Sequence, residues 1–273
     1  MTSADRNHAK TAGFDRANAT VASIVFLIAL VVYFLTKAPT FSFWDCGEFV
    51  ACSHILGIPH PPGSPLYILI GRIFAALPLA SDIAVRVNLL SVISSAFVAL
   101  FTYLVAVRLI RHWFHDPGTA YNRIIAYVGG FTGALFMAFS DTNWGNSVEA
   151  EVYAPAMLAM MLIYWLVLKY YDCRETTRGS KLMLLALYIG ILGVGIHLTL
   201  FIVIPVLGLY FILKKNAGTR EWAIVSLFFL AEIYLIFFLS SRSGEIPFYM
   251  PSIILFMFFL FHVVLTQKLS RPV

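Results

Sequence analysis

Two carboxylates and a histidine lie close together in a polar stretch that follows the first apolar run. The stretch reads Trp44-Asp45-Cys46-Gly47-Glu48-Phe49 and continues to His60-Pro61-Pro62-Gly63. Asp45 and Glu48 are three positions apart, so one helical turn would aim both carboxylates at the same point. Such a pair could act as a base or hold a hard divalent cation. Trp44 and Phe49 flank the acids, which favours a buried interfacial setting over a solvated loop with a capping aspartate.

The histidine of this stretch has a side chain that titrates near neutral pH. Two prolines and a glycine follow His60 directly. Proline has a fixed φ angle, so the pattern predicts a stiff extended segment that holds the imidazole before the next helix. The alternative is that the paired prolines only start that helix, which would not require a histidine.

A second polar stretch carries Asp141, Glu149 and Glu151 and leads into another apolar run. Carboxylates at the end of a membrane helix are energetically costly unless they line a water-filled cavity or pair with other polar groups. Glu149 and Glu151 are two positions apart, so on a helix they cannot point the same way. One is then a helix N-terminal charge favoured by the dipole and the other a candidate for substrate binding. We favour these two over Asp141.

Three further residues are candidates for binding a substrate. His197 lies in a glycine-rich bend, where a half-helix end could meet a polar ligand or the ring could simply be packed and hydrogen-bonded. Arg242 is the cation best placed to bind an anionic lipid head group, and Arg72 is the second choice. For both arginines, snorkelling of the side chain to the membrane interface is an equal alternative.

The composition places the chain among membrane proteins. It is 60% hydrophobic and 12% charged over 273 residues, and its mean hydropathy is +0.84. The net charge of +5 comes from short basic clusters between apolar runs, so no nucleic-acid partner is expected. Cys46, Cys52 and Cys173 lack metal-ligand spacing; Cys46 and Cys52 could form a disulfide, but nothing requires one.

The apolar runs have the length of membrane helices, and they predict an all-α, polytopic fold. They lie at 20–36, 83–107, 124–139, 153–171, 182–213, 222–239 and 250–266. The 182–213 run is long enough for two spans and must fold back near residues 195–197, so about eight spans are expected. A shorter run at 65–80 has outer residues on both flanks, and we expect an interfacial helix there.

The basic residues orient these spans. Of the 19 lysines and arginines, all but Lys37, Arg72, Arg86 and Arg242 fall on one side, which the positive-inside rule makes cytoplasmic. The acids gather on the other side, where the outer loop 37–82 is the catalytic candidate. This divides the chain into a cytoplasmic tail 1–19, a transmembrane core 20–266 and a cytoplasmic end 267–273. The last run ends close to the C-terminus, as in a membrane core cut from a longer chain.

The first outer loop, with Trp44-Asp45-Cys46-Gly47-Glu48-Phe49 and His60-Pro61-Pro62-Gly63, resembles that of the glycosyltransferase-C membrane enzymes. Within them it is most similar to the protein O-mannosyltransferases that modify IPT domains, and to bacterial relatives of formerly unknown function. The entry into a span at Glu149-Ala150-Glu151-Val152-Tyr153 fits the same pattern.

The resemblance implies a membrane enzyme that transfers a sugar, mannose by analogy, from a polyprenyl-phosphate donor with inversion. Asp45, or second Glu48, would deprotonate a serine or threonine hydroxyl of a protein acceptor, or a hydroxyl of a glycan. Trp44, His60, Glu149, Glu151, His197 and Arg242 would bind substrates, with His60 or Arg242 stabilising the departing phosphate. The setting would be a bacterial inner membrane with a periplasmic active face.

Two other classes of protein fit the same residues. In a transporter or lipid flippase, the outer acids would bind a cation or a cationic substrate, and acids would continue through the bilayer. In a non-catalytic assembly subunit, the acidic loops would tolerate alanine.

Overall fold

The computed structural model describes residues 15–114, 116–174, 176–203, 223 and 227. In this part of the chain the regular elements are helices only, as predicted. They are α2 (Arg16–Thr36), α3 (Cys46–Ile55), α4 (Pro65–Ala76), α5 (Ile83–Trp113), α6 (Ala120–Ala138), α7 (Asp141–Ser147), α8 (Tyr153–Asp172), α9 (Thr177–Val194) and the 3-10 helix η1 (Leu198–Ile202).

Several of these helices can cross a membrane. Within the described residues, α2, α5, α8 and α9 are long and apolar enough, and α6 with α7 forms a pair bent by 67° that would make a fifth span. The chain is therefore an integral membrane protein. The predicted runs 222–239 and 250–266, and the second half of 182–213, lie outside the described residues. The total of eight spans stays a prediction.

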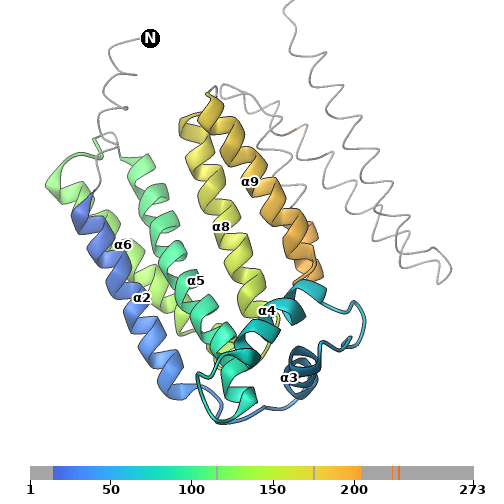
Figure 1. Ribbon diagram of the computed structural model, residues 1–273. Coiled ribbons are helices and arrows are strands. Elements are labelled where there is room, and N and C mark those ends of the chain that lie inside the picture. Colours follow the sequence, from blue (N-terminus) through green and yellow to red (C-terminus); the bar gives the residue numbers. More distant parts are fainter. Residues whose placement is uncertain (1–14, 115, 175, 204–222, 224–226, 228–273) are drawn as a thin grey trace, which may run out of the picture.

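Helix α5 is the centre of the bundle. It packs against α2 and α6 on one side and against α8 on the other, while α9 covers α8 (Figure 1). Its buried face is rich in small side chains, among them Ser91, Ser94, Ser95, Ala96 and Ala99. Small residues let helix backbones approach closely, which favours van der Waals packing where lipid offers no hydrophobic driving force.

The long helix α5 continues beyond the predicted end of its span at residue 107. Arg108 stops the apolar pattern, but its guanidinium donates to the Leu168 carbonyl at 2.9 Å and forms an ion pair with Asp172. These contacts with the end of α8 let the charged side chain stay within the helix, so α5 ends only at Trp113.

A helix, α4, is present where the interfacial helix was predicted, but it is shorter than expected, and its place at the membrane interface stays a prediction. It ends at Ala76, and Pro78 disfavours helical backbone at the residue before it, Leu77. Figure 1 shows α3 and α4 across one end of the bundle, where α5 and α8 begin.

The predicted break in the 182–213 run is also present. Helix α9 ends at Val194, and His197 is the N-cap of η1. The backbone N–H of Leu66, in the first turn of α4, donates to the Gly195 carbonyl at 2.7 Å. The break is thus bound to α4, at the same end of the molecule as both polar stretches.

Candidate active site

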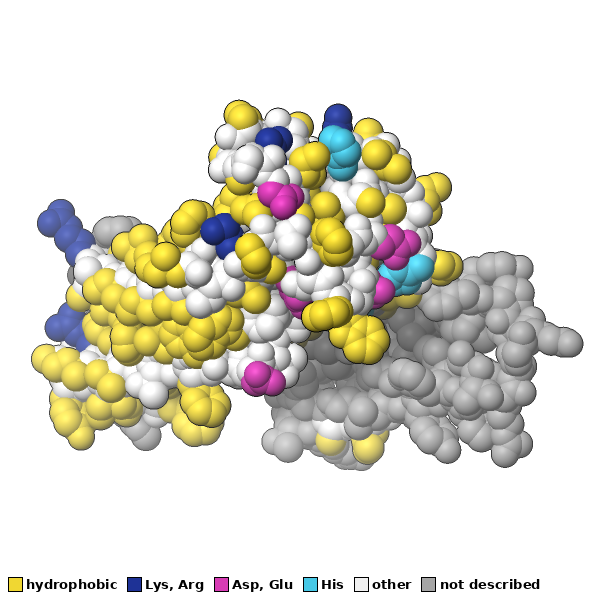
Figure 2. Space-filling view, turned by 90° about the horizontal axis from the view of Figure 1, so that it is seen from below, with side chains coloured by type: hydrophobic (Ala, Val, Ile, Leu, Met, Phe, Trp, Pro, Cys, Tyr) yellow, Lys and Arg dark blue, Asp and Glu magenta, His cyan; other side chains and the backbone are white. Residues whose placement is uncertain are grey.

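Helix α3 positions the paired carboxylates. Asp45 is its N-cap residue and Glu48 lies in its first turn. The Asp45 side chain makes no capping hydrogen bond to the helix, so its carboxylate is free for other partners. Figure 2, which looks onto this end of the molecule, shows acidic and histidine side chains close together among exposed hydrophobic ones.

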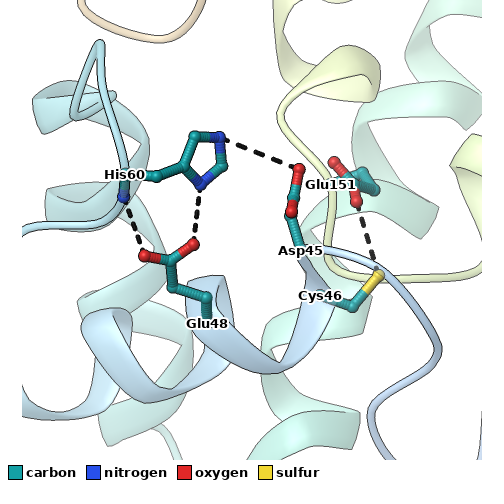
Figure 3. Close-up of polar contacts among 5 residues, drawn as sticks. All are labelled: Asp45, Cys46, Glu48, His60 and Glu151. Atoms are coloured by element: carbon teal, nitrogen blue, oxygen red, sulfur yellow. Dashed lines mark hydrogen bonds and ion pairs between the residues drawn. The ribbon is translucent and has the colours of Figure 1, made fainter.

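His60 lies opposite both carboxylates (Figure 3). One oxygen of Glu48 is 2.7 Å from His60 Nδ1, and the other accepts from the His60 backbone N–H at 2.7 Å. Asp45 Oδ2 is 3.8 Å from His60 Nε2. The three residues that the sequence singled out therefore form one cluster at the bundle end, and Glu48 holds the histidine loop against α3.

The prediction of an extended segment after His60 is wrong. The Gly63 N–H donates to the His60 carbonyl at 2.9 Å, so the chain turns here, around a cis Pro61–Pro62 bond. Gly63 has φ +86°, which glycine adopts without strain. Two successive prolines with a glycine favour a tight turn as well as an extended chain, and the bonds to Glu48 select the turn.

Charge interactions within the cluster favour an ion pair. The hydrogen bond from His60 lowers the pKa of Glu48, and the same bond to Glu48 raises the pKa of His60, with Asp45 contributing in the same direction. Between these two pKa values the histidine is an imidazolium beside a carboxylate. All three side chains are exposed, so solvent screens the pair.

The same three side chains could hold a metal ion. One ligand atom from each of Asp45, Glu48 and His60 lies within 4.8 Å of the others. Two carboxylate oxygens and an imidazole nitrogen are ligands that manganese or zinc accepts. A cation would compete with the Glu48–His60 hydrogen bond for the same atoms.

Buried polar groups anchor the loop before α3. Asn88 of α5 is fully buried and its amide donates to the carbonyls of Ala38 and Thr40 at 3.1 and 3.0 Å. The Ala38 N–H donates to the Val148 carbonyl at 2.9 Å, which ties the first outer loop to the second. The polar Asn88 within an apolar run is the sequence signal that could have indicated this anchor.

Glu149 and Glu151 are not part of a helix, so the predicted division of their roles by helix geometry is wrong. Helix α8 begins only at Tyr153, and the Glu151 N–H donates to the Glu149 carbonyl at 2.9 Å in a tight turn. Both carboxyl groups lie close enough to the Cys46 thiol to raise its pKa, and Cys46 Sγ is 3.5 Å from Glu151 Oε1. Burial, followed by these two charges, raises the pKa of Cys46.

The sequence did not identify Cys46 as a residue that contacts the acids of the site. Its thiol meets a carboxyl group more than a hundred positions along the chain, and nothing local in the sequence indicates this. The thiol is fully buried, and Cys46 and Cys52 are both free, without the disulfide that the sequence left open.

The two aromatic residues that flank the acids, Trp44 and Phe49, differ in how far the protein buries them. Phe49 is 3% exposed and its ring contacts His60 and Tyr67, in agreement with the expected buried setting. Trp44 is 94% exposed from the protein and has φ 61°, a backbone conformation uncommon for a large side chain, so its expected burial in the membrane interface stays a prediction. The indole therefore projects from the loop directly beside Asp45.

The remaining predicted residues lie around the cluster or outside the described part. The His197 ring contacts the Tyr153 ring at 5.1 Å between centroids, tilted by 56°, and its Nδ1 is hydrogen-bonded to the Thr199 hydroxyl at 2.9 Å. Asp141 starts α7 and is exposed, while Arg72 donates to the His54 carbonyl. Arg242 lies outside the described residues.

Comparison with known proteins supports the resemblance. The chain is 28% identical to the protein O-mannosyl-transferase TMEM260 of Mus musculus over 158 residues, 58% of this chain and 20% of the mouse protein. It is 25% identical to the protein O-mannosyl-transferase tmem260 of Dictyostelium discoideum over 156 residues, 55% of this chain and 17% of that protein. The chain thus matches about a fifth of these relatives' length, and no solved structure matches it.

The match to a protein family is broader. The family described as the protein O-mannosyl-transferase TMEM260 N-terminal domain matches residues 45–220, which begin at Asp45 and include the clustered acids and His60. The resemblance to O-mannosyltransferases is confirmed at the level of this family. The chain belongs to the family of TMEM260 N-terminal domains.

Proposed function

We propose that this chain carries the catalytic loop of a membrane glycosyltransferase of the glycosyltransferase-C type. It transfers a sugar, mannose by analogy with the named relatives, from a polyprenyl-phosphate donor to a serine or threonine hydroxyl of a protein. The reaction takes place on the non-cytoplasmic side, which is the periplasmic face in a bacterial inner membrane. The sequence comparisons support the class of enzyme, and the geometry of the cluster supports the roles of its residues.

One observation carries the assignment of the base. Both oxygens of Glu48 are occupied by His60, whereas Asp45 makes no capping bond and stands 3.8 Å from the ring with a side chain 53% exposed. Asp45 is therefore the carboxylate that an acceptor hydroxyl can reach. A general base must come within hydrogen-bond distance of the proton that it takes.

The reaction then follows from the cluster. Asp45 accepts the proton of the acceptor hydroxyl, whose oxygen bonds to the anomeric carbon as the bond from that carbon to the phosphate oxygen breaks. The polyprenyl phosphate leaves with the electron pair, and attack from the opposite face inverts the anomeric carbon. An imidazolium at His60, favoured by Glu48, stabilises the departing negative charge.

The first test is sugar transfer in proteoliposomes that contain the full-length protein, radiolabelled polyprenyl-phosphate mannose and a serine-containing acceptor peptide. Asp45→Asn removes the base while it keeps the size of the side chain, so transfer should fall by about 10²- to 10⁴-fold. Donor binding should survive. Glu48→Gln should reduce transfer less, because it acts through His60.

Asp141→Asn is the matched control, since Asp141 is an exposed acid at the same end of the bundle and is not part of the cluster. Transfer that survives Asp45→Asn unchanged would rule out Asp45 as the base. Absence of transfer from any donor, combined with saturable binding of a cation, would favour the transporter class.

A further inference from the structure

Cations from three helices gather at the end of the bundle opposite α3 and α4, here called the basic end. They are Arg108 of α5, Lys169 in the last turn of α8 and Arg178 in the first turn of α9. Figure 1 shows the last turns of α5 and the connection from α8 to α9 at this end. Arg108 and Arg178 lie close enough to Lys169 for their charges to repel its ammonium group, and Asp172 is an acid close enough to attract it. The cations outnumber this acid.

Asp172 is bound by Arg108, through one nitrogen of the guanidinium group. Nη2 forms the ion pair with Asp172 and also donates to the Leu168 carbonyl at 2.9 Å. The Nη1 and Nε groups of Arg108 have no partner among the described residues, although the side chain is only 26% exposed. A guanidinium group presents its N–H donors in a planar fork that fits carboxylate and phosphate groups. Arg108 therefore has a second edge that can bind an anion.

Lys169 is partly buried and forms no ion pair within the part of the chain that the structure describes. Its Nζ lies over the Trp165 ring, 4.7 Å from the ring centroid. This cation–π contact offsets part of the cost of removing the ammonium group from water, but it supplies no oxygen that accepts a hydrogen bond. Arg178 is exposed and likewise forms no ion pair with a described acid. The charges of Lys169 and Arg178 are therefore not neutralised by the protein.

The backbone at the end of α8 does not replace the missing acid. The C-terminal end of a helix favours cations, because its last carbonyls lack partners within the helix. Here these carbonyls already have donors. Leu168 accepts from Arg108, and the carbonyls of Lys169 and Tyr170 accept from the thiol and the N–H of Cys173, at 3.4 and 3.0 Å. An anionic oxygen from another molecule is the partner that the ammonium group of Lys169 and the second edge of Arg108 lack.

The surroundings of the cations favour a phospholipid over a free phosphate ion. Leu109 follows Arg108 on α5 and is 52% exposed, and Tyr164 and Tyr171 of α8 are each 38% exposed. Tyrosine and tryptophan side chains near the end of a membrane span are typical of the level of the lipid head groups. A phospholipid brings a phosphate group to the cations and acyl chains to the exposed apolar side chains, whereas a free phosphate ion would contact the cations alone.

We propose that Arg108, Lys169 and Arg178 bind the phosphate group of an anionic phospholipid in the membrane leaflet at the basic end. The bound lipid links α5, α8 and α9 and stabilises their packing. Its net negative charge compensates the excess of cations, whereas the choline group of a zwitterionic lipid would be repelled by them. This site lies at the opposite end of the bundle from the candidate active site, and the inference does not depend on the proposed function.

The test is a titration of the full-length protein in detergent with fluorescent phosphatidylglycerol. Unlabelled phosphatidylglycerol should displace the probe from wild type, and phosphatidylcholine should not. Lys169→Met keeps the length of the side chain without its charge and should weaken binding about fivefold. Arg178→Gln should have a similar effect and changes only an exposed side chain, so its fold is preserved. Arg123→Gln is the matched control, because Arg123 is an exposed cation of the same end on α6, away from α8.

Asp172→Asn should change the affinity in the opposite direction. It removes the acid that faces the cations, so phosphatidylglycerol should bind about fivefold more tightly, which a purely structural role of the ion pair with Arg108 does not predict. Equal displacement of the probe by phosphatidylcholine would overturn the inference. So would an equal loss of affinity in Lys169→Met and Arg123→Gln, because that pattern belongs to general attraction by a basic surface. Displacement by millimolar inorganic phosphate would show a site for free anions and overturn the assignment to a lipid.

Discussion

At the scale of single residues, Asp45 and Glu48 have different surroundings, although both lie at the start of α3. Glu48 binds the side chain and the backbone of His60, so it both orients the ring and favours the imidazolium. Asp45 lies at the helix start with few partners and is exposed to solvent. In the proposed mechanism, these surroundings, and not the type of side chain, assign positioning to Glu48 and proton transfer to Asp45.

The Glu48–His60 pair leads to a prediction about histidine reactivity. Glu48→Gln replaces the charged acceptor that raises the pKa of His60 with a neutral amide, so more of the imidazole is neutral at a given pH near neutrality. Because diethyl pyrocarbonate modifies neutral imidazole, we expect His60 to be modified faster in Glu48→Gln than in wild type. Mass spectrometry of the peptide measures this rate.

His54 is the internal reference for this experiment, because it lies exposed on the same helix, outside the cluster. Its rate should be the same in both proteins. Equal His60 rates in wild type and Glu48→Gln would show that Glu48 does not control the protonation of the ring.

At the scale of the elements, the site depends on how closely α5 approaches its neighbours. Gly130 of α6 faces α5, and a Cβ there would meet Val107 Cγ2 at 2.5 Å and Tyr103 Cδ2 at 3.2 Å. Helix α5 also carries Asn88, which anchors the loop that leads to Asp45. The packing of α6 on α5 therefore supports the element that positions the site.

We predict that Gly130→Ala destabilises the protein by about 1–3 kcal/mol, because the added methyl group forces α5 and α6 apart. Thermal unfolding in detergent measures the effect as a lower midpoint. Gly133→Ala on the same helix is the matched control, since a Cβ there meets nothing within 4 Å. It should leave the midpoint unchanged or raise it, as alanine favours helix over glycine. A similar loss in both variants would contradict the packing argument.

At the scale of the whole molecule, the two ends of the bundle differ in charge. The cluster, Glu151 and Asp141 lie at one end. The opposite end carries basic residues in the last turn of α5, the first turn of α6 and the first two turns of α9, namely Arg111, Arg123, Arg178 and Lys181. The positive-inside rule predicts that the basic end is cytoplasmic and that the candidate active site faces the other compartment.

This orientation predicts which positions a reagent can reach. Ser81 precedes α5 at the end that holds the site, and Gly118 precedes α6 at the opposite end; both are exposed. In a Cys173→Ser background, Ser81→Cys should react with a membrane-impermeant maleimide added from the non-cytoplasmic side. Gly118→Cys should react only after the membrane is permeabilised. The reverse pattern would place the site in the cytoplasm.

Much of this protein could be predicted from the sequence because the determining interactions are local. The length of an apolar run determines that α2, α5 and α8 are helices able to span lipid, and the three-residue spacing places Asp45 and Glu48 on one turn. The basic clusters place both polar stretches on the same side of the membrane. The tertiary structure bears out that they meet at one end.

Only the tertiary structure decided which side chains touch. The turn that brings His60 back to Glu48, the exposure of Trp44, and the contact of Glu151 with Cys46 each depend on packing between segments far apart in the chain. A pattern of residue types does not reveal such contacts, because the same acid can lie in solvent or be buried between helices, and only burial raises its pKa.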